Sequence, residues 1–249
     1  MAKLLNLLSV NFRRAFLRKR FIIGGGFPCA IGLLIVYLAY RTDGNVDYAP
    51  FFMTGFLPML IGITAGLYIS QDYTTNTIRN KIINGHSRTS IYLSNFITSM
   101  VGTFIIYGVY LLLTFGLGSL VTGVSSDFDG ERTFKGILLV FCILFTFTSI
   151  TVMLCMINSG VSGTVISTLM YMILGMSSLV IVFVDNDLFK ELFVNLNPTF
   201  QIDTVSEYAT GAEYSEENIH ISWIPISSIA YIILTTVIGI SVFNKKDIK

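Results

Sequence analysis

The sequence predicts an all-α polytopic membrane protein, folded as a single domain over residues 1–249. The first observation is composition: 53% of the residues are hydrophobic, only 12% are charged, and the mean hydropathy is +0.72. A soluble domain carries roughly 25% charged residues, so this chain has too little polar surface to cover a globule in water. The second observation is a set of six long apolar runs, and the third is a segregation of charge between the segments that connect them.

Residues 1–20 predict an amphipathic elbow helix lying in the cytoplasmic membrane interface. Apolar residues recur there at helical spacing, and Arg and Lys fill the other side. Such a helix places its apolar side in the acyl region and its cations near anionic headgroups. The segment is either a topogenic anchor alone or an elbow that also contacts a cytoplasmic partner.

Six apolar runs have the length of a membrane-spanning helix, because about 20 residues at 1.5 Å each cross the ~30 Å hydrocarbon layer. We expect six transmembrane helices at 21–40, 51–70, 91–122, 134–157, 161–184 and 223–243. The third run is longer than the layer requires, so it should tilt or protrude into one interface.

The charges of the connecting segments predict that both termini are cytoplasmic. With the N-terminus inside, twelve of the sixteen Lys and Arg residues fall in cytoplasmic segments, beside only two acids, Asp72 and Asp247. The outer segments then hold four basic residues and thirteen acids. Because cytoplasmic loops are enriched in Lys and Arg, this distribution favours an N-in, C-in chain in the cell membrane.

The residue types in the spans argue against several functions. No span has an ionisable residue in its middle, whereas ion-coupled carriers and pumps need such groups. The chain has no P-loop and no channel-filter sequence, and its net charge of +1 does not suit a nucleic-acid binder. The cysteines lie inside apolar runs, which predicts neither a disulfide nor a metal site: Cys29, Cys142 and Cys155. Energy for any transport should therefore come from a partner.

The segment 71–90 predicts a short amphipathic helix that projects from the membrane on the cytoplasmic side. A plain connector between antiparallel helices needs only a few residues, and this one has twenty. Asn84-Gly85 is a signal for the end of a helix. Ile78 and Ile82 are four residues apart and form an apolar stripe outside the bilayer. Such a stripe would fit a groove on another protein.

The run from Asp72 to Ser94, DYTTNTIRNKIINGHSRTSIYLS, resembles the coupling-helix region of ABC-2-type transporter permeases. In that family the loop between the second and third spans docks into the ATP-binding subunit and transmits its closure to the spans. The family often has Glu where this chain has Asp72. The resemblance implies that the following residues contact an ATP-binding subunit: Asp72, Tyr73, Thr77, Ile78, Arg79, Lys81, Ile82, Gly85 and Arg88.

The resemblance also implies an activity and partners. The chain would be the permease subunit of an ATP-driven exporter and not itself an enzyme, with ATP and Mg²⁺ held on the separate ATP-binding subunit. Six spans are half of the usual transporter set, so a second permease copy or a related permease chain would pair with it. The apolar spans suit an amphipathic peptide or a small hydrophobic cargo. The chain is similar to three groups of such permeases: exporters of peptide toxins such as phenol-soluble modulins, drug exporters and bacteriocin-immunity transporters.

The acidic segment 185–222 predicts two short external helices before the last span. Its first half has apolar residues at helical spacing, and Asn197-Pro198 then ends that helix. A second helix can follow from Thr199 to Thr210. Backbone of this kind is tolerated at membrane depth only where protein buries it, so the pair is either re-entrant or interfacial. ABC-2 permeases have short external helices at this place, which agrees with the resemblance.

Two alternatives belong to other classes. A membrane scaffold or sensor without transport could use the same cytoplasmic loop to recruit a partner. An intramembrane serine protease is suggested by Gly160-Val161-Ser162-Gly163, but that chemistry needs a histidine within about 2.6–3.2 Å of the serine. The chain has only His86 and His220, which we expect in the projecting loop and at the outer end of the last span.

Overall fold

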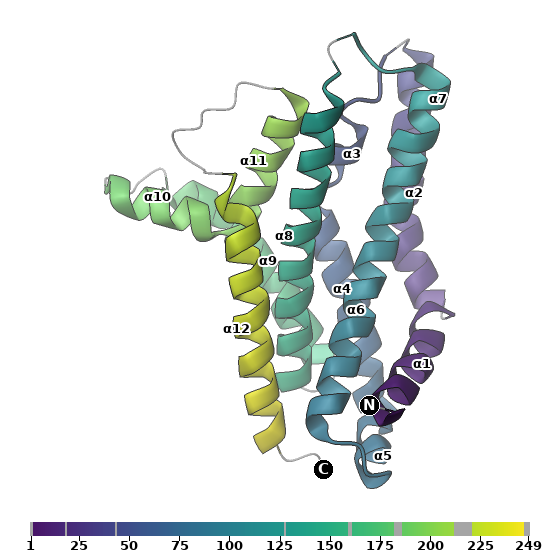
Figure 1. The fold of residues 1–249 in the computed structure, drawn as a ribbon, viewed down its shortest axis with the longest axis vertical. Helices are drawn as coiled ribbons and strands as arrows, with labels where there is room; N and C mark the ends of the chain where they lie inside the picture. The colour runs from purple at the N-terminus through teal and green to yellow at the C-terminus, as the bar shows by residue number, and fades with distance from the viewer. Residues whose placement is uncertain are drawn as a thin grey trace.

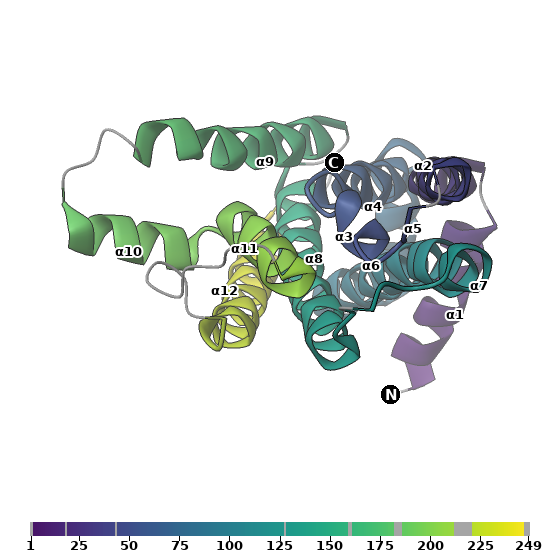
Figure 2. The same ribbon diagram turned by 90° about the horizontal axis from the view of Figure 1, so that it is seen from above.

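The structure, a computed structural model, describes residues 2–17, 19–42, 44–126, 128–158, 161–181, 186–211 and 221–246. Every regular element in these ranges is a helix, so the predicted all-α class is confirmed for them. Figures 1 and 2 show a bundle of long helices with shorter helices at both ends. The elements in chain order are α1 (Ala2–Phe16), α2 (Lys19–Arg41), α3 (Ala49–Phe52), α4 (Leu57–Thr74), α5 (Thr77–Ile83), α6 (Arg88–Leu111), the π-helical segment η1 (Leu112–Leu117), α7 (Gly118–Thr122), α8 (Gly130–Ile157), α9 (Val161–Ile181), α10 (Asp187–Leu196), α11 (Pro198–Thr210) and α12 (Trp223–Lys245).

Four helices within the described ranges are long and apolar enough to cross a membrane. They are Phe21–Arg41, Arg88–Thr122, Gly130–Ile157 and Trp223–Lys245, and Val161–Ser177 is a shorter apolar helix. The second expected span differs from its prediction at both ends. Its helix, α4, begins only at Leu57, because Met53–Phe56 form a turn ahead of Pro58 in the first helical turn. It then continues past residue 70, and its last turn is polar.

The central helix is α8, which contacts α4, α6, α9, α11 and α12 (Figure 2). Its buried residues lie on several sides of the helix, which is the pattern of an element enclosed by others. Buried side chains form one large cluster that contains Leu57, Tyr107 and Ile143. A second cluster contains Ile69, Ile78 and other residues near the end of the bundle that carries α5. The apolar contacts of α8 therefore hold the bundle together.

The two short helices predicted in 185–222 are present as α10 and α11. The Asn197 side chain accepts a 3.0 Å hydrogen bond from the backbone N–H of Thr199 and so begins α11 directly after α10. α11 buries Ile202 and Val205 and packs on α8. α10 extends sideways from the bundle (Figures 1 and 2). The end of the predicted segment, at 212–220, lies outside the described residues.

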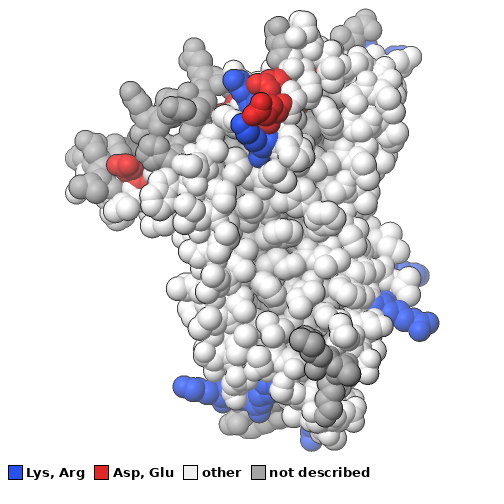
Figure 3. Space-filling view, in the orientation of Figure 1, with Lys and Arg blue, Asp and Glu red and all other residues white. Residues whose placement is uncertain are grey.

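Charge is distributed unevenly along the bundle. Among the described residues on the face drawn in Figure 3, the acidic side chains lie in the upper half, whereas the charged side chains at the lower end and on the side near it are Lys and Arg. The helix α5 lies at that lower end, together with the start of α1 and the end of α12 (Figure 1). The segregation of charge seen in the sequence thus corresponds to two ends of one folded body.

The contact between α8 and α9 generates the first prediction. A Cβ atom at Gly163 would lie 2.5 Å from the Cα atom of Cys155, which is backbone and cannot turn aside. Changing Gly163→Ala should therefore separate the helices and lower the free energy of unfolding by about 1–3 kcal/mol, the usual cost of overpacking. Gly175→Ala is the matched control, because nothing lies within 4 Å of that position on α9. Thermal unfolding in detergent measures both, and equal melting temperatures would contradict the predicted contact.

Candidate functional site

The helix α5 forms where the sequence predicts a projecting helix. The chain leaves α4 through Asn76, whose backbone has a positive φ of 53°, and α5 ends at Asn84. Gly85 follows with φ of 78°, a conformation that glycine adopts without steric cost. The hydroxyl of Ser87 then accepts a hydrogen bond from the backbone N–H of Ser90 and caps α6. The predicted end of the helix at Asn84-Gly85 is confirmed.

A buried cluster of charges joins α5 to α4 and α1. The carboxylate of Asp72 has no exposed surface. Its Oδ2 accepts a 2.7 Å hydrogen bond from Lys81 Nζ, and its Oδ1 lies 2.7 Å from Arg14 Nη2. The side chain of Lys81 is 8% exposed and that of Arg14 is 21% exposed. Two cations from different helices thus hold one carboxylate at the end of α4.

An asparagine extends this cluster to α6. Lys81 Nζ also donates to Asn11 Oδ1 at 3.0 Å, and Asn11 is fully buried. The Nδ2 group of Asn11 donates to the side chains of Ser94 and Asn95 on α6. One connected set of polar side chains therefore links α4, α5 and α6, which follow one another in the sequence, to the distant N-terminal helix α1.

At Lys81, the cost of removing the ammonium group from water exceeds the attraction of the Asp72 carboxylate. Removal from water lowers the pKa of Lys81 below its ordinary 10.5, and the attraction of the Asp72 carboxylate opposes this shift without cancelling it. Buried ion pairs often contribute little net stability, but removing one partner leaves an uncompensated charge. We conclude that the cluster mainly determines where α5 lies.

The apolar stripe of α5 faces inward, which corrects the expectation that it is free for a partner. Ile78 is 1% exposed and belongs to the same buried cluster as Ile69. Ile82 is half-buried against that cluster. Ile83, in contrast, is 71% exposed. The stripe packs on the ends of long helices of its own chain because α5 folds back on α4 and α6.

Tyr73, also expected to contact a partner, instead pairs a carbonyl group at the end of a helix. The hydroxyl of Tyr73 donates a 2.6 Å hydrogen bond to the Met156 carbonyl at the end of α8. Lys246 Nζ donates to the carbonyls of Met156 and Ile157 and lies 4.8 Å from the centre of the Tyr73 ring. Burial lowers the pKa of Lys246 from its ordinary 10.5. The terminal carbonyls of α8, which have no partner within their helix, are thereby paired.

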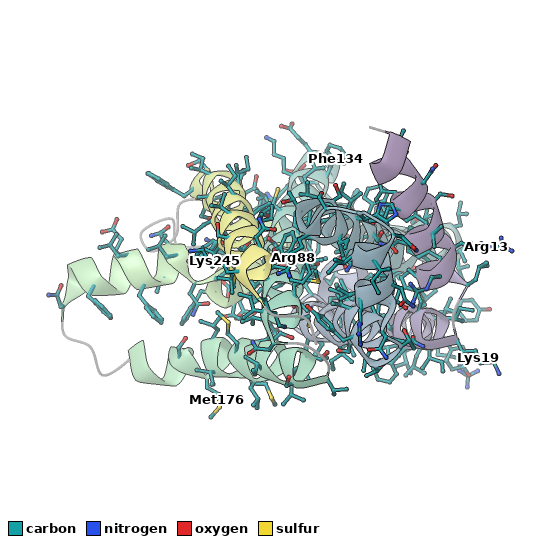
Figure 4. The ribbon with its side chains drawn as sticks, turned by 90° about the horizontal axis from the view of Figure 1, so that it is seen from below. Arg13, Lys19, Arg88, Phe134, Met176 and Lys245 are labelled. Carbon is teal, nitrogen blue, oxygen red and sulfur yellow. The ribbon has the colours of Figure 1, made fainter. Side chains whose placement is uncertain are left out.

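Arg88 pairs the carbonyl groups at the end of α12 in the same way. Its Nη1 atom donates to the carbonyls of Phe243, Asn244 and Lys246. Figure 4 views this end of the molecule from below and shows Arg88 beside Lys245, where α12 ends next to the start of α6. A cation at a helix C-terminus also interacts favourably with the helix dipole.

Of the nine predicted contact residues, three are buried, four are half-buried, and only Arg79 and Gly85 are exposed. Asp72, Tyr73, Ile78, Lys81 and Arg88 make the internal contacts described above. Thr77 is half-buried, and its hydroxyl is 2.8 Å from that of Thr75. The exposed surface on and beside α5 consists of Thr74, Thr75, Asn76, Arg79, Asn80, Ile83, Asn84 and Gly85. We name these eight residues the α5 outer surface. Contact between another protein and the α5 outer surface stays a prediction.

The sequence did not predict the internal contacts of Asn11, Arg14 and Lys246. A signal for Asn11 was available, because it is a polar residue four positions before Ala15 on the apolar side of the N-terminal helix. Arg14 and Lys246 belong to basic runs in which no single residue is distinguished by its neighbours. Their roles depend on which helices meet in space.

The described residues contain no group of three His, Cys, Asp or Glu side chains that could hold a metal ion. Ser162, the serine of the protease alternative, is exposed and donates a 2.8 Å hydrogen bond to the Asn158 carbonyl. His220 lies outside the described residues.

The charge cluster generates the second prediction. Asp72→Asn should lower the free energy of unfolding by about 3–5 kcal/mol, because it leaves Lys81 charged and buried without its anion. The double variant Asp72→Asn, Lys81→Met should recover much of this loss, since Arg14 can turn toward solvent. Glu131→Gln removes the exposed ion pair with Lys135 and should have no measurable effect. A double variant as unstable as Asp72→Asn alone would show that the pairing is not the cause.

The helix-end contacts generate the third prediction. Arg88→Ala leaves the carbonyls at the end of α12 without their donor and should cost about 1–3 kcal/mol of stability. Arg79→Ala is the matched control, because Arg79 is exposed on α5 and should change stability by less than about 0.5 kcal/mol. Thermal melts in detergent compare the two arginines, and equal effects would refute the assigned role of Arg88.

Comparisons with known proteins place the chain in a family. A family model described as "Protein of unknown function (DUF2705)" matches residues 33–249. This range includes α4, α5, α6, Asp72 and Lys81, and it begins after α1. A comparison with curated proteins finds no match. Because the matched range covers most of the sequence, the chain belongs to the DUF2705 family.

Proposed function

We propose that this protein is the transmembrane permease subunit of an ATP-driven exporter of the ABC-2 type. The observation that carries the proposal is α5, a short helix across one end of the bundle with a buried, ion-paired base and an exposed α5 outer surface. The likeness of residues 72–94 to a coupling helix supports the same role. A separate ATP-binding subunit would bind the α5 outer surface and hold the ATP and Mg²⁺.

The base of α5 is suited to transmit movement. Asp72 and Lys81 connect α5 to α4, Arg14 and Asn11 connect both to α1, and Ser94 and Asn95 continue the connection into α6. A force on the outer surface of α5 would therefore act on the ends of three other helices together. Packed elements of this kind shift as rigid bodies because their interiors have few voids.

The proposal includes six spans with both termini in the cytoplasm. The helices α2, α4, α6 to α7, α8, α9 and α12 would be the spans, with α5 on the cytoplasmic side. This orientation would place the basic end of Figure 3 inside the cell, as the positive-inside rule requires. α1 would be the interfacial elbow, and α10 and α11 would lie at the outer face.

A second permease chain and a hydrophobic cargo complete the proposal. Both α2 and α9 have many exposed apolar side chains, including Ile23, Tyr40, Ile173 and Met176. These faces need lipid or another permease chain, since contiguous exposed apolar surface marks an interaction site. Because the spans carry no ionisable residue in their middle, the cargo would be an amphipathic peptide or another hydrophobic molecule.

The fourth prediction concerns the partner. Arg79→Glu combined with Ile83→Asp changes two exposed residues of α5 and leaves its buried base intact. A tagged wild-type chain, gently solubilised from its native membrane, should co-purify with an ATP-binding subunit, and this variant should recover at least tenfold less of it. Lys245→Glu is the control, because it reverses an exposed charge at the same end of the bundle outside α5.

The outcome also separates transport from the scaffold alternative. ATP hydrolysis by the purified complex should rise when cargo is added if the chain is a permease, whereas a scaffold that only recruits the partner should show no such stimulation. Absence of any ATP-binding subunit from the wild-type sample would refute the proposed function. Equal recovery with both variants would refute the role of the α5 outer surface.

A further inference from the structure

A cavity lies where α1 turns into α2, beside α4 and α6. One wall is aromatic: the rings of Phe16 and Phe21 meet edge to face with their centres 4.8 Å apart. The opposite walls carry hydroxyl and amide groups beside small and aliphatic residues. They include Thr64, Gln71, Thr98, Ser99, Gly102 and Thr103. The free space is about 30 Å³.

One polar group in this cavity has no partner among the described residues. Ser99 is 6% exposed, and its Oγ atom makes no hydrogen bond. A buried hydroxyl in that state costs free energy, so native structures rarely leave one unpaired. An unpaired hydroxyl that lines a cavity points to a ligand that completes its hydrogen bonds.

The neighbouring hydroxyls define what that ligand must offer. Thr64 donates its hydrogen to the Ile61 carbonyl, and Thr98 donates its hydrogen to the Ser94 carbonyl. Each can therefore only accept a further hydrogen bond, whereas Ser99 can both donate and accept. A hydroxyl group, an amide or a water molecule can donate to one hydroxyl and accept from another.

The charge of the cavity lining limits the class of ligand further. None of the described residues that line the cavity is acidic or basic, so a charged ligand group would be desolvated without an ion partner. The aromatic and aliphatic wall suits a hydrocarbon chain. The cavity also lies at the junction of the interfacial helix α1 with the apolar helix α2, where an amphiphile with its polar end near the membrane surface can enter.

We propose that this cavity binds the hydroxyl end of an uncharged amphiphile from the membrane, with Ser99 Oγ as its hydrogen-bond partner. In this proposal the Phe16 and Phe21 rings cover the adjoining part of the ligand's hydrocarbon chain and turn outward to admit the ligand. The site lies apart from the α5 outer surface; the inference rests on the proposed membrane placement of α1 but not on an ATP-binding partner.

Photolabelling of the full-length protein in detergent tests the proposal. The probe is octanol carrying a diazirine, and octane carrying the same diazirine lacks only the hydroxyl. The alcohol should label the peptides that contain Phe16, Phe21 and residues 98–106. Ser99→Ala should reduce this labelling about threefold to tenfold, the worth of one neutral hydrogen bond. It should leave the melting temperature unchanged or higher, because no internal hydrogen bond is lost.

A glycine pair provides matched variants on α6. A Cβ atom at Gly102 would lie 3.3 Å from the Phe21 ring, so Gly102→Ala narrows the cavity and should reduce labelling by the alcohol. Gly108→Ala should leave labelling unchanged, because nothing lies within 4 Å of that position. Equal labelling of wild type and Ser99→Ala, or equal labelling by the octane probe, would overturn the proposal. So would labelling absent from these peptides, which would indicate a resident water only.

Discussion

The arrangement at one end of this protein depends on the burial of the Asp72 carboxylate. A carboxylate with no exposed surface must be paired, and here Lys81 and Arg14 supply the cations. Since the three residues belong to α4, α5 and α1, the pairing specifies how these helices meet. The lowered pKa of Lys81 shows that desolvation outweighs the attraction at that residue. The cluster therefore acts on geometry more than on net stability, and it gives α5 a defined position relative to the bundle.

The same end of the molecule pairs the carbonyl groups that every helix leaves free at its C-terminus. Tyr73 and Lys246 serve α8, and Arg88 serves α12. The Tyr73 bond joins the end of α4 to the central helix α8, and the Arg88 bonds join the start of α6 to the end of α12. The α5 outer surface thus rests on a base that reaches most of the long helices. This connection is the physical argument for a role of α5 in transmitting force.

Sequence patterns predicted much of this arrangement. The apolar runs located the long helices, Gly85 marked the end of α5, and Asn197-Pro198 marked the boundary between α10 and α11. The start of α4 was predicted six residues too early, because the apolar residues of Met53–Phe56 form a turn that hydropathy does not distinguish from a helix. The partner-contact residues were predicted as one surface, although five of the nine make internal contacts. Charged and aromatic residues in a polar segment look exposed until the residues that pair with them are known.

Composition and the periodicity within each segment are sufficient to predict the helical class, the apolar character of the long helices and the unequal distribution of charge. The inward orientation of Ile78 and Lys81, and the position of Ser99 at a cavity without a hydrogen-bond partner among the described residues, are seen only in the folded chain. Helical periodicity shows which residues share a face of α5, but not which face packs. That choice depends on Asn11 and Arg14, which lie more than sixty residues earlier in the chain and meet α5 only when the bundle has formed.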